Sequence, residues 1–595
     1  MPRATRSRQR ALTLQGALSL GSLTLFVAAA FAAGSPSAAP ADAAVFVRLQ
    51  RFQAETTPQP VDSPSAPAAQ SSAPAVASAG PVVASPEVSA TGSVSPGESP
   101  SPIQSLAPPS PIPVQISPAN ALVVLGHSAS VHVLSPPSGI VMLSGFDPAI
   151  VRAVFNPIDR TVDLFGLRSG STTVILTDDY GLTATLAVLV ESYAGKAYST
   201  TSITVSGDPA SADFVAEEAA QAARLVAYPE AGALVRVDAA EIKAAHELRP
   251  DDAETVYAPL SIEGAGYVPY HQTVAVHIVN LAQPNVAPKN LLVSDFPETI
   301  VENGTLFYAD VNFDAPARLL YYHYSAPRSA TRRVLVKAQN NGLDTSLLQL
   351  ISGIAGPNPN ILAVGHDSTK RFLMHEASGE GKIFEVPARA TVNVVDQLLP
   401  AGTLVSGLMQ LRVVSGSGVR VAVVVQDADQ TPIEPISDTL LSSAVKHSRG
   451  IYQVPQFDYD VSYTVGGDPA TLLIGKLPLP NLVEGEVLGG DYGVKQSAAI
   501  TLLNGEPQAQ RVGMWFEPRG GRATGTFLID GRLVQLHPVE AARPALVRVF
   551  TVPAHGYRRV NFVTMPEGGS SYPVRVTLSS DPPPGGSWNI SSAAY

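Results

Sequence analysis

The sequence predicts a mostly β protein whose folded part consists of β-sandwich modules. Three observations predict this class. Apolar residues alternate with polar ones along most segments after residue 114, which is the period of a strand with one buried face. The chain holds 47 Gly and 52 Pro, the residues that make turns. Charged residues are only 15% of the chain, against about 25% in typical soluble domains.

The order of modules follows from shifts in composition along the 595 residues. We expect, in chain order, a signal peptide or N-terminal anchor at 1–43, a disordered Pro/Ser/Ala-rich tether at 44–113, a small β module at 114–195, a βαβ insert at 196–250, and two β-sandwiches at 251–440 and 441–595.

The N-terminus is typical of an export signal. Four arginines, Arg3, Arg6, Arg8 and Arg10, precede an uncharged apolar segment at 12–33. Small residues spaced for cleavage lie at its end, at 30–32, and beyond it, at 41–43, as in a signal peptide. The segment is also long enough to span a bilayer of about 30 Å. Cleavage and retention as an anchor both stay open, and either places the rest of the chain in the periplasm or at the cell surface.

The tether and the overall charge exclude several classes of function. No Lys or Arg lies between Arg51 and Arg152, and the net charge is −11. Binding to phosphate backbones needs clustered Lys and Arg, so no nucleic-acid partner is expected, and a membrane is expected only through a retained N-terminal segment. The chain has no Cys, which excludes disulfides, thiolate catalysis and Cys-ligated metals.

The module at 114–195 has the clearest strand pattern. Val131 and Val133 alternate with His132 and Leu134, and an Asp/Gly turn at 178–181 separates two apolar runs. Two strands joined by such a turn form a hairpin.

Three stretches of this module carry a resemblance, namely Asp147-Pro148-Ala149-Ile150-Val151, Val162-Asp163-Leu164-Phe165-Gly166 and Gly170-Ser171-Thr172-Thr173-Val174. They resemble the N-terminal domain of bacterial pilus-formation proteins of the secretin group, and bacterial Ig-like modules of the second group. The resemblance implies an Ig-like β module of the periplasm or cell surface, associated with pili or secretion. No membrane-pore domain follows it, so a channel is not expected.

The next segment predicts a βαβ unit. A strand at 203–205 precedes Asp208, the expected N-cap, and Pro209, the expected first helical residue. A return strand is expected at 234–237 and a second short helix at 239–248.

From residue 255 onwards nearly every segment is strand-like, and a strand–Asn–loop–strand pattern recurs at Asn280, Asn340 and Asn504. We interpret it as a repeat of two sandwiches, in which Asn tolerates left-handed backbone and caps the turn. The body resembles β-sandwich regions of uncharacterised exported bacterial proteins, through the stretches 490–493 and 565–570.

Candidate binding residues are few. Tyr322 and Tyr324 would share one face of a strand, where they could stack on a sugar or simply pack across strands. Asp427 and Asp429 have the i, i+2 spacing of oxygen ligands for Ca²⁺, although solvated turns explain the same spacing.

No motif specifies a reaction. Gly126-His127-Ser128-Ala129-Ser130 lacks the final Gly that a nucleophile elbow needs. His323, His366 and His375 are expected in turns or on the surface. We therefore expect no enzyme, no cofactor and no metal site.

The sequence as a whole predicts a non-enzymatic exported envelope or cell-surface protein with a structural or adhesive role, and the resemblance of its first module adds an association with pilus or secretion machinery. Its expected partners are other envelope or surface proteins. The alternative is an extracellular protein that binds glycans or, less in keeping with the sequence, cleaves them. Aromatic residues, on which sugars would stack, are only 6% of the chain, and this counts against the alternative.

Overall fold

Strands dominate the structure, so the predicted fold class is confirmed. The computed structural model describes residues 112–136, 139–430, 436–437, 439–483 and 485–589. The predicted leader at 1–43 and residues 44–111 of the predicted tether lie outside this range. Among the described residues, no helix combines the length and the apolar character needed to cross a membrane.

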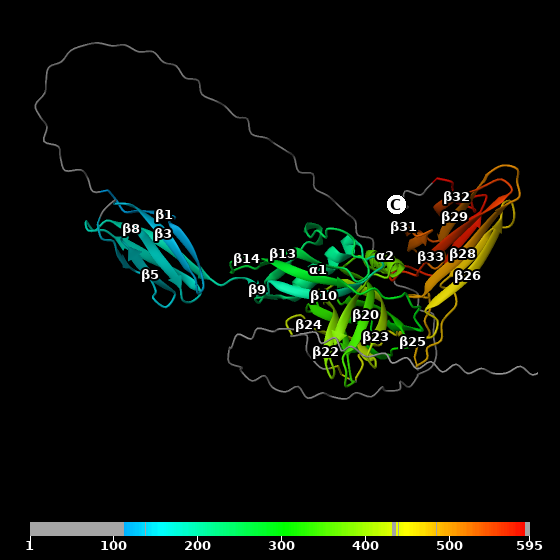
Figure 1. Cartoon of the computed structure of the whole chain (residues 1–595), viewed down its shortest axis with the longest axis horizontal. Helices are drawn as coiled ribbons and strands as arrows, with labels where there is room; N and C mark the ends of the chain where they lie inside the picture. Colours follow the sequence, from blue (N-terminus) through cyan, green and yellow to red (C-terminus); the bar gives the residue numbers. More distant parts are fainter. Residues whose placement is uncertain (1–111, 137–138, 431–435, 438, 484, 590–595) are drawn as a thin grey trace, which may run out of the picture. The chain divides into compact units, whose positions relative to one another are not determined.

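The first described module is a sandwich of two four-stranded sheets (Figure 1). Its strands are β1 (Gln115–Ser117), β2 (Asn120–Val124), β3 (Ser128–Ser135), β4 (Met142–Ser144), β5 (Val151–Asn156), β6 (Thr161–Gly166), β7 (Gly170–Thr177) and β8 (Thr183–Glu191). One sheet has the order β1-β3-β6-β5 and the other β2-β8-β7-β4. The alternating apolar residues, such as Val131 and Val133, point inward and form one core.

The predicted hairpin is present as β7 and β8, which pair antiparallel. Asp178 holds its turn, because the carboxylate accepts hydrogen bonds from the N–H groups of Tyr180 and Leu182 at 2.9 and 2.8 Å. Gly181 has φ +77°, a backbone conformation that glycine adopts without steric cost.

The second part of the chain differs in detail from the predicted βαβ unit. Its elements are β9 (Gly195–Ala197), β10 (Thr200–Ser206), α1 (Ala212–Leu225), β11 (Ala227–Pro229), β12 (Leu234–Arg236), η1 (Ala239–Glu241), β13 (Ala253–Glu263) and β14 (Tyr270–Asn280). The return strand β12 is present but does not pair with β10, because the long hairpin of β13 and β14 lies between them. The expected helix at 239–248 is only the short 3₁₀ turn η1.

The helix α1 also begins later than predicted. Its N-cap is Ser211 rather than Asp208, and the Ser211 hydroxyl accepts a hydrogen bond from the N–H of Phe214 at 3.3 Å. A hydroxyl at this position satisfies one of the free N–H groups of the first turn. The buried face of α1 packs on the sheet of β10, β13 and β14.

The same sheet continues into the next sandwich, across the predicted boundary at 250/251. The strands of this region are β15 (Asn290–Ser294), β16 (Thr299–Ile300), β17 (Gly304–Val311), β18 (Ala317–Ser325), β19 (Arg332–Gln339), β20 (Ser346–Asn358), β21 (Gly381–Val386), β22 (Thr391–Leu399), β23 (Leu404–Ser415), β24 (Val419–Asp427) and β25 (Arg449–Tyr452). The long sheet has the order β12-β13-β14-β10-β21-β20-β23-β18-β15-β25. A smaller sheet, β17-β24-β19-β22, faces it across an apolar core.

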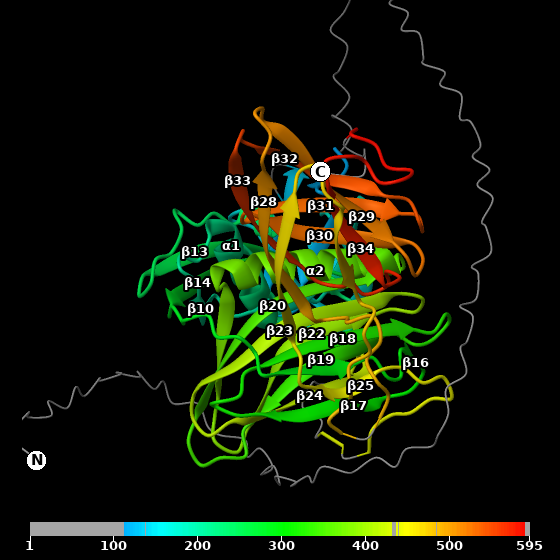
Figure 2. The ribbon, with the colours of Figure 1, turned by 90° about the vertical axis from the view of Figure 1, so that its right-hand side faces the viewer.

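One helix was not predicted. α2 (Ile361–Ser378) connects β20 to β21, begins at the N-cap Asn360 and ends at Gly379 in the left-handed conformation. It lies between the long sheet and the C-terminal strands (Figure 2), with contacts to β20 and β23 on one side. Gly365, Ser368 and Thr369, which follow one another closely within it, are weaker helix formers than Ala or Leu.

The C-terminal sandwich begins later than residue 441, because β25 still pairs with β15 of the preceding sandwich. Its strands are β26 (Gln456–Thr464), β27 (Ala470–Ile474), β28 (Lys495–Asn504), β29 (Gln510–Pro518), β30 (Ala523–Ile529), β31 (Arg532–Val539), β32 (Ala545–Val552), β33 (Gly556–Thr564) and β34 (Val574–Ser579). They form the sheets β26-β28-β33-β30-β31 and β27-β34-β29-β32 around a core of their own.

Candidate binding groove

A groove lies on the outward face of one sheet of the first module, over β2, β8 and β7. β2 pairs with β8 in parallel, which sets Leu122 beside Leu189, and β7 pairs with β8 antiparallel, which sets Ser171 beside the same Leu189. The next row along the strands holds Asn120, Ala187 and Thr173 by the same pairings.

The strand period turns these side chains outward. Successive residues of a strand point to opposite faces, and Val123, Val174 and Val188 on the inward face are at most 2% exposed. On the outward face Leu122 is 50% exposed and Leu189 is 41% exposed. Large apolar side chains therefore stand in solvent on a face that a free-standing sandwich would cover with polar residues.

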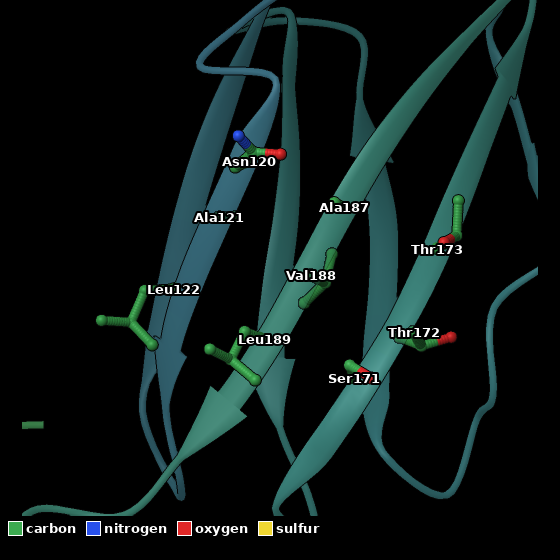
Figure 3. Close-up of a pocket in the computed structure, with 9 residues that line it drawn as sticks. All are labelled: Asn120, Ala121, Leu122, Ser171, Thr172, Thr173, Ala187, Val188 and Leu189. Carbon is green, nitrogen blue, oxygen red and sulfur yellow. The ribbon is translucent and has the colours of Figure 1, made fainter. Parts of the chain in front are cut away.

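The groove is shallow and has a cavity volume of about 620 Å³. Figure 3 shows Leu122 and Leu189 next to each other on neighbouring strands, with Asn120 further along the first of them. The small side chains of Ala187 and Ser171 leave the space between the larger ones. The lining consists of Asn120, Ala121, Leu122, Ser171, Thr172, Thr173, Ala187, Val188 and Leu189.

The lining residues are suited to binding and carry no group suited to acid–base catalysis. It offers methyl groups, hydroxyls and one amide, and none of the nine residues titrates near neutral pH. A general acid or base must carry a titratable group within hydrogen-bond reach of its substrate. The groove can bury apolar atoms and donate or accept a few hydrogen bonds, which is how binding sites recognise a partner.

The predicted tyrosine pair does not form a surface platform. Tyr322 is only 8% exposed, and a Cβ placed on Gly568 would lie 2.7 Å from its ring. Burial is also the main reason that the pKa of Tyr322 lies well above its ordinary value. Tyr324 is half-buried against the same small cluster. A buried ring cannot stack on a sugar from solvent, so packing explains Tyr322.

The predicted aspartates lie where the expected solvated turn would place them. Asp427 ends β24 and its backbone carbonyl accepts from the N–H of Gln430 at 3.2 Å, while Asp429 is exposed in the same turn. Within the described residues, neither belongs to a group of three side chains close enough to share a metal ion.

The histidines expected in turns or on the surface are placed differently. His366 and His375 lie on α2, and His366 is buried. His323 is completely buried in β18; its Nδ1 donates to the carbonyl of Pro297 at 3.0 Å and its Nε2 accepts from the Ser294 hydroxyl at 3.1 Å. Burial lowers the pKa of His323 to about 4, so the imidazole is neutral at pH 7.

The groove itself was missed, although the sequence carried a signal for it. In the run 186–190, Leu-Ala-Val-Leu-Val, both strand faces are apolar, whereas a half-buried strand alternates with polar residues. Such a run indicates either a strand buried on both faces or an exposed apolar surface. Only the three-dimensional structure distinguishes the two.

Comparison with known proteins finds similar solved structures but no family to which the chain can be assigned. No family model matches the sequence, and no curated protein matches it. Among solved structures, the chain is similar to the N-terminal Ig1-2 module of the Drosophila receptor protein tyrosine phosphatase DLAR, with 11% identity and a TM-score of 0.13 over 29% of this chain and 100% of that chain. It is also similar to the Bacteroides ovatus mixed-linkage glucan protein SGBP-B, with 10% identity and a TM-score of 0.11 over 51% of this chain and 70% of that one. Carbohydrate-binding modules of the β-sandwich superfamily match with 10% identity and a TM-score of 0.12, over 52% of this chain and 94% of that one.

Proposed function

We propose that this protein is an exported, non-enzymatic component of the bacterial envelope or cell surface, with a structural or adhesive role. The observation that carries the proposal is the uncharged groove on the first module, where Leu122 and Leu189 stand half exposed on an outward sheet face. Exposed apolar patches of this kind mark sites of association.

The chemistry of the groove favours a protein partner. Glycan sites commonly stack sugars on aromatic rings, and the nine lining residues include none. A partner that presents an apolar side chain between Leu122 and Leu189 would bury both, which stabilises a complex by about 25 cal/mol per Å² of apolar surface before the costs of association. Other envelope or surface proteins, including pilus or secretion components, are the proposed partners.

The groove provides the first test. Purified full-length protein is added to envelopes isolated from a strain that lacks it, and bound protein is measured against concentration. We expect the double variant Leu122→Lys/Leu189→Lys to bind at least about tenfold more weakly, since it places two charges in the interface. Leu134→Lys is the matched control, because Leu134 is 59% exposed on the other sheet of the same module. Equal binding by all three proteins would remove the groove from the proposal.

The location is tested separately. Intact cells are digested with proteinase K and blotted with an antibody against the C-terminal sandwich; trypsin is unsuitable because the segment between Arg51 and Arg152 offers it no site. Loss of the signal in intact cells supports a surface role. Protection until the outer barrier is breached supports a periplasmic role in assembly machinery.

A further inference from the structure

A second group of side chains converges at the β15–β25 edge of the long sheet, in the sandwich that follows the first module. β15 and β25 pair antiparallel with Ser294 opposite Arg449. The residues just beyond these two strand ends are therefore neighbours, and the N–H of Asp295 donates to the carbonyl of Ser448 at 3.1 Å. This pairing brings Asp295 and Glu298 to His447, which lies 149 positions further along the chain than Glu298.

The three side chains meet at one imidazole nitrogen. His447 Nδ1 lies 3.1 Å from Glu298 Oε2 and 3.7 Å from Asp295 Oδ2, and the three donor atoms all lie within 4.8 Å of one another. Each side chain is between 25 and 32% exposed, so an ion could reach the group from solvent.

The backbone beneath these side chains is fixed from two directions. On the β18 side, the Glu298 carbonyl accepts from the N–H of Tyr324 at 2.8 Å, and His323 bonds both Ser294 and Pro297, as described above. On the β25 side, the Arg449 guanidinium donates to the Phe296 carbonyl at 3.1 Å. A site whose ligands sit on fixed backbone loses little entropy when it binds an ion.

Hydrogen bonds among the three side chains cannot satisfy all of their polar atoms. His447 Nδ1 carries at most one proton, yet two carboxylates face it, so a single N–H cannot be directed at both. The other oxygen of Asp295, Oδ1, is buried and has no hydrogen-bond partner in the described part of the chain. Buried polar atoms are normally partnered, and this orphaned oxygen is an observation independent of the convergence of the three side chains.

The spacing fits a small divalent ion. Ligand atoms at about 2.0–2.2 Å from a tetrahedral ion are roughly 3.3–3.6 Å apart, and the two measured separations lie on either side of that range. One imidazole nitrogen with two carboxylate oxygens suits Zn²⁺ better than Ca²⁺ or Mg²⁺, which prefer all-oxygen sites.

We propose that Asp295, Glu298 and His447 bind one Zn²⁺ per chain. The ion would bind the imidazole nitrogen and both carboxylates, which a single N–H cannot satisfy together. It would thereby link the segment 295–298 to the segment 446–449. Three protein ligands leave a fourth position to water. This assignment is independent of the groove and of the proposed partner.

Metal binding by the full-length protein tests the assignment. Protein without a His tag is treated with EDTA, dialysed against Zn²⁺ and analysed for bound zinc by mass spectrometry, and its thermal midpoint is measured with and without the ion. We expect one zinc per chain and a higher midpoint with Zn²⁺, because an ion that binds only the folded state stabilises it. Mg²⁺ at the same concentration should leave the midpoint unchanged.

Variants locate the ion. We expect His447→Ala and Glu298→Gln to lower zinc affinity at least about tenfold, while His277→Ala, which removes an exposed histidine of β14, binds as the parent does. Glu298→Gln keeps the size of the side chain, so it tests the site even where His447→Ala fails to fold. Absence of stoichiometric zinc in the parent protein, or unchanged affinity in Glu298→Gln, would overturn the assignment.

Discussion

Buried asparagines hold the turns of both sandwiches. The side chain of Asn340, which follows β19, is fully buried. Its Nδ2 donates to the carbonyls of Asp344 and Val386 at 2.8 and 2.9 Å, and its Oδ1 accepts from the N–H of Gly342 at 2.8 Å. The side chain thus replaces the strand pairing that the backbone loses where it turns.

Asn504 repeats this arrangement in the C-terminal sandwich. It donates to the carbonyl four residues on, Gln508, at 2.8 Å and accepts from the N–H two residues on, Glu506, at 2.9 Å. The recurrence predicted from sequence is therefore also found in the hydrogen bonds. Of the two predicted reasons, the capping of the turn by the side chain is found in these hydrogen bonds. The left-handed backbone is wrong, because neither Asn340 nor Asn504 has a positive φ.

Replacement of Asn340 by Ala should lower the free energy of unfolding by about 2–4 kcal/mol, since two buried carbonyls lose their donor and one N–H loses its acceptor. Urea denaturation followed by circular dichroism measures it. Asn341→Ala is the matched control: Asn341 is exposed, and its change should stay within about 0.5 kcal/mol. Equal effects of the two substitutions would contradict the role given to Asn340.

Asp491 is a second residue whose environment predicts a measurable effect. Its side chain is buried, with one oxygen 3.1 Å from the N–H of Gly475 and the other without a partner among the described residues. Burial raises the pKa of Asp491 to about 6. The unfolded carboxyl has a pKa of about 3.9, so stability falls as the pH rises from about 4 to 6 and stays lower above that.

Asp491→Asn should therefore stabilise the protein at pH 8, by about 1–3 kcal/mol, and the gain should shrink as the pH falls through 6 towards 4. Asn tolerates the positive φ of 54° at this position. Asp530→Asn is the control, because Asp530 has φ 52° but is exposed. Urea denaturation at several pH values measures both; a gain that does not depend on pH would contradict the assignment.

At the scale of elements, α2 packs between the long sheet and the C-terminal sandwich. A Cβ on Gly353 of β20 would lie 2.2 Å from the carbonyl oxygen of Ser368 in α2, and a Cβ on Gly365 of α2 would lie 1.8 Å from the carbonyl oxygen of Gly568. The helix backbone is therefore in direct contact with β20 on one side and with the loop 565–570 on the other. Glycine is required at both contacts because no side-chain atom fits.

Gly365→Ala tests this packing. In an exposed helix the change would stabilise by about 1 kcal/mol, but here we expect a loss of about 1–3 kcal/mol, because the added methyl forces two backbones apart. Gly489→Ala is the control, since a Cβ there meets no atom within 4 Å. Denaturation of both variants measures the difference; a stabilised Gly365→Ala would show that α2 does not contact the loop.

At the scale of the whole molecule, the two large sandwiches share a buried boundary. His366 on α2 lies 2.9 Å from Glu567 through its Nδ1. Within the C-terminal sandwich, the Tyr492 hydroxyl donates to the carbonyl of Ser570 at 2.7 Å, which holds the stretches 490–493 and 565–570 together. Arg318, which is fully buried, donates to the carbonyl of Gly493 at 3.3 Å. The stretches 490–493 and 565–570, which carry the resemblance to exported sandwich proteins, thus meet at this boundary.

His366→Ala should reduce the free energy of unfolding by about 3–5 kcal/mol, the usual cost of breaking a buried pair. Burial lowers the pKa of His366, but the hydrogen bond and charge of Glu567 raise it by more, so the net pKa is above its ordinary 6.5. The contribution is therefore complete below about pH 6.5 and is lost as the pH rises through the raised pKa.

The difference between parent and His366→Ala should accordingly be larger at pH 5.5 than at pH 8.5, as measured by urea denaturation. His277→Ala, an exposed histidine of β14, serves as the control and should show no such trend. A loss of stability of the same size at both pH values would mean that His366 acts by packing alone.

The sequence by itself determined the high strand content, because alternation along a strand and turn residues such as Asp178 and Gly181 act over a few residues. It also found the hairpin of β7 and β8 and the recurring asparagines. It did not find α2, in which Gly365, Ser368 and Thr369 are weak helix formers. The glycine at position 365 is explained only by its contact with Gly568 of the C-terminal sandwich.

The candidate sites were decided by the tertiary structure. The groove depends on which face of β8 is left uncovered, and the proposed zinc group depends on the pairing of β15 with β25, which joins Glu298 to His447 across more than a hundred residues. Tyr322 shows the converse, because its place on a strand face was predictable but its burial under Gly568 was not. Local patterns set the period of each strand. Long-range packing decides which strand faces become covered and which strand ends meet, and no local pattern of residues contains that information.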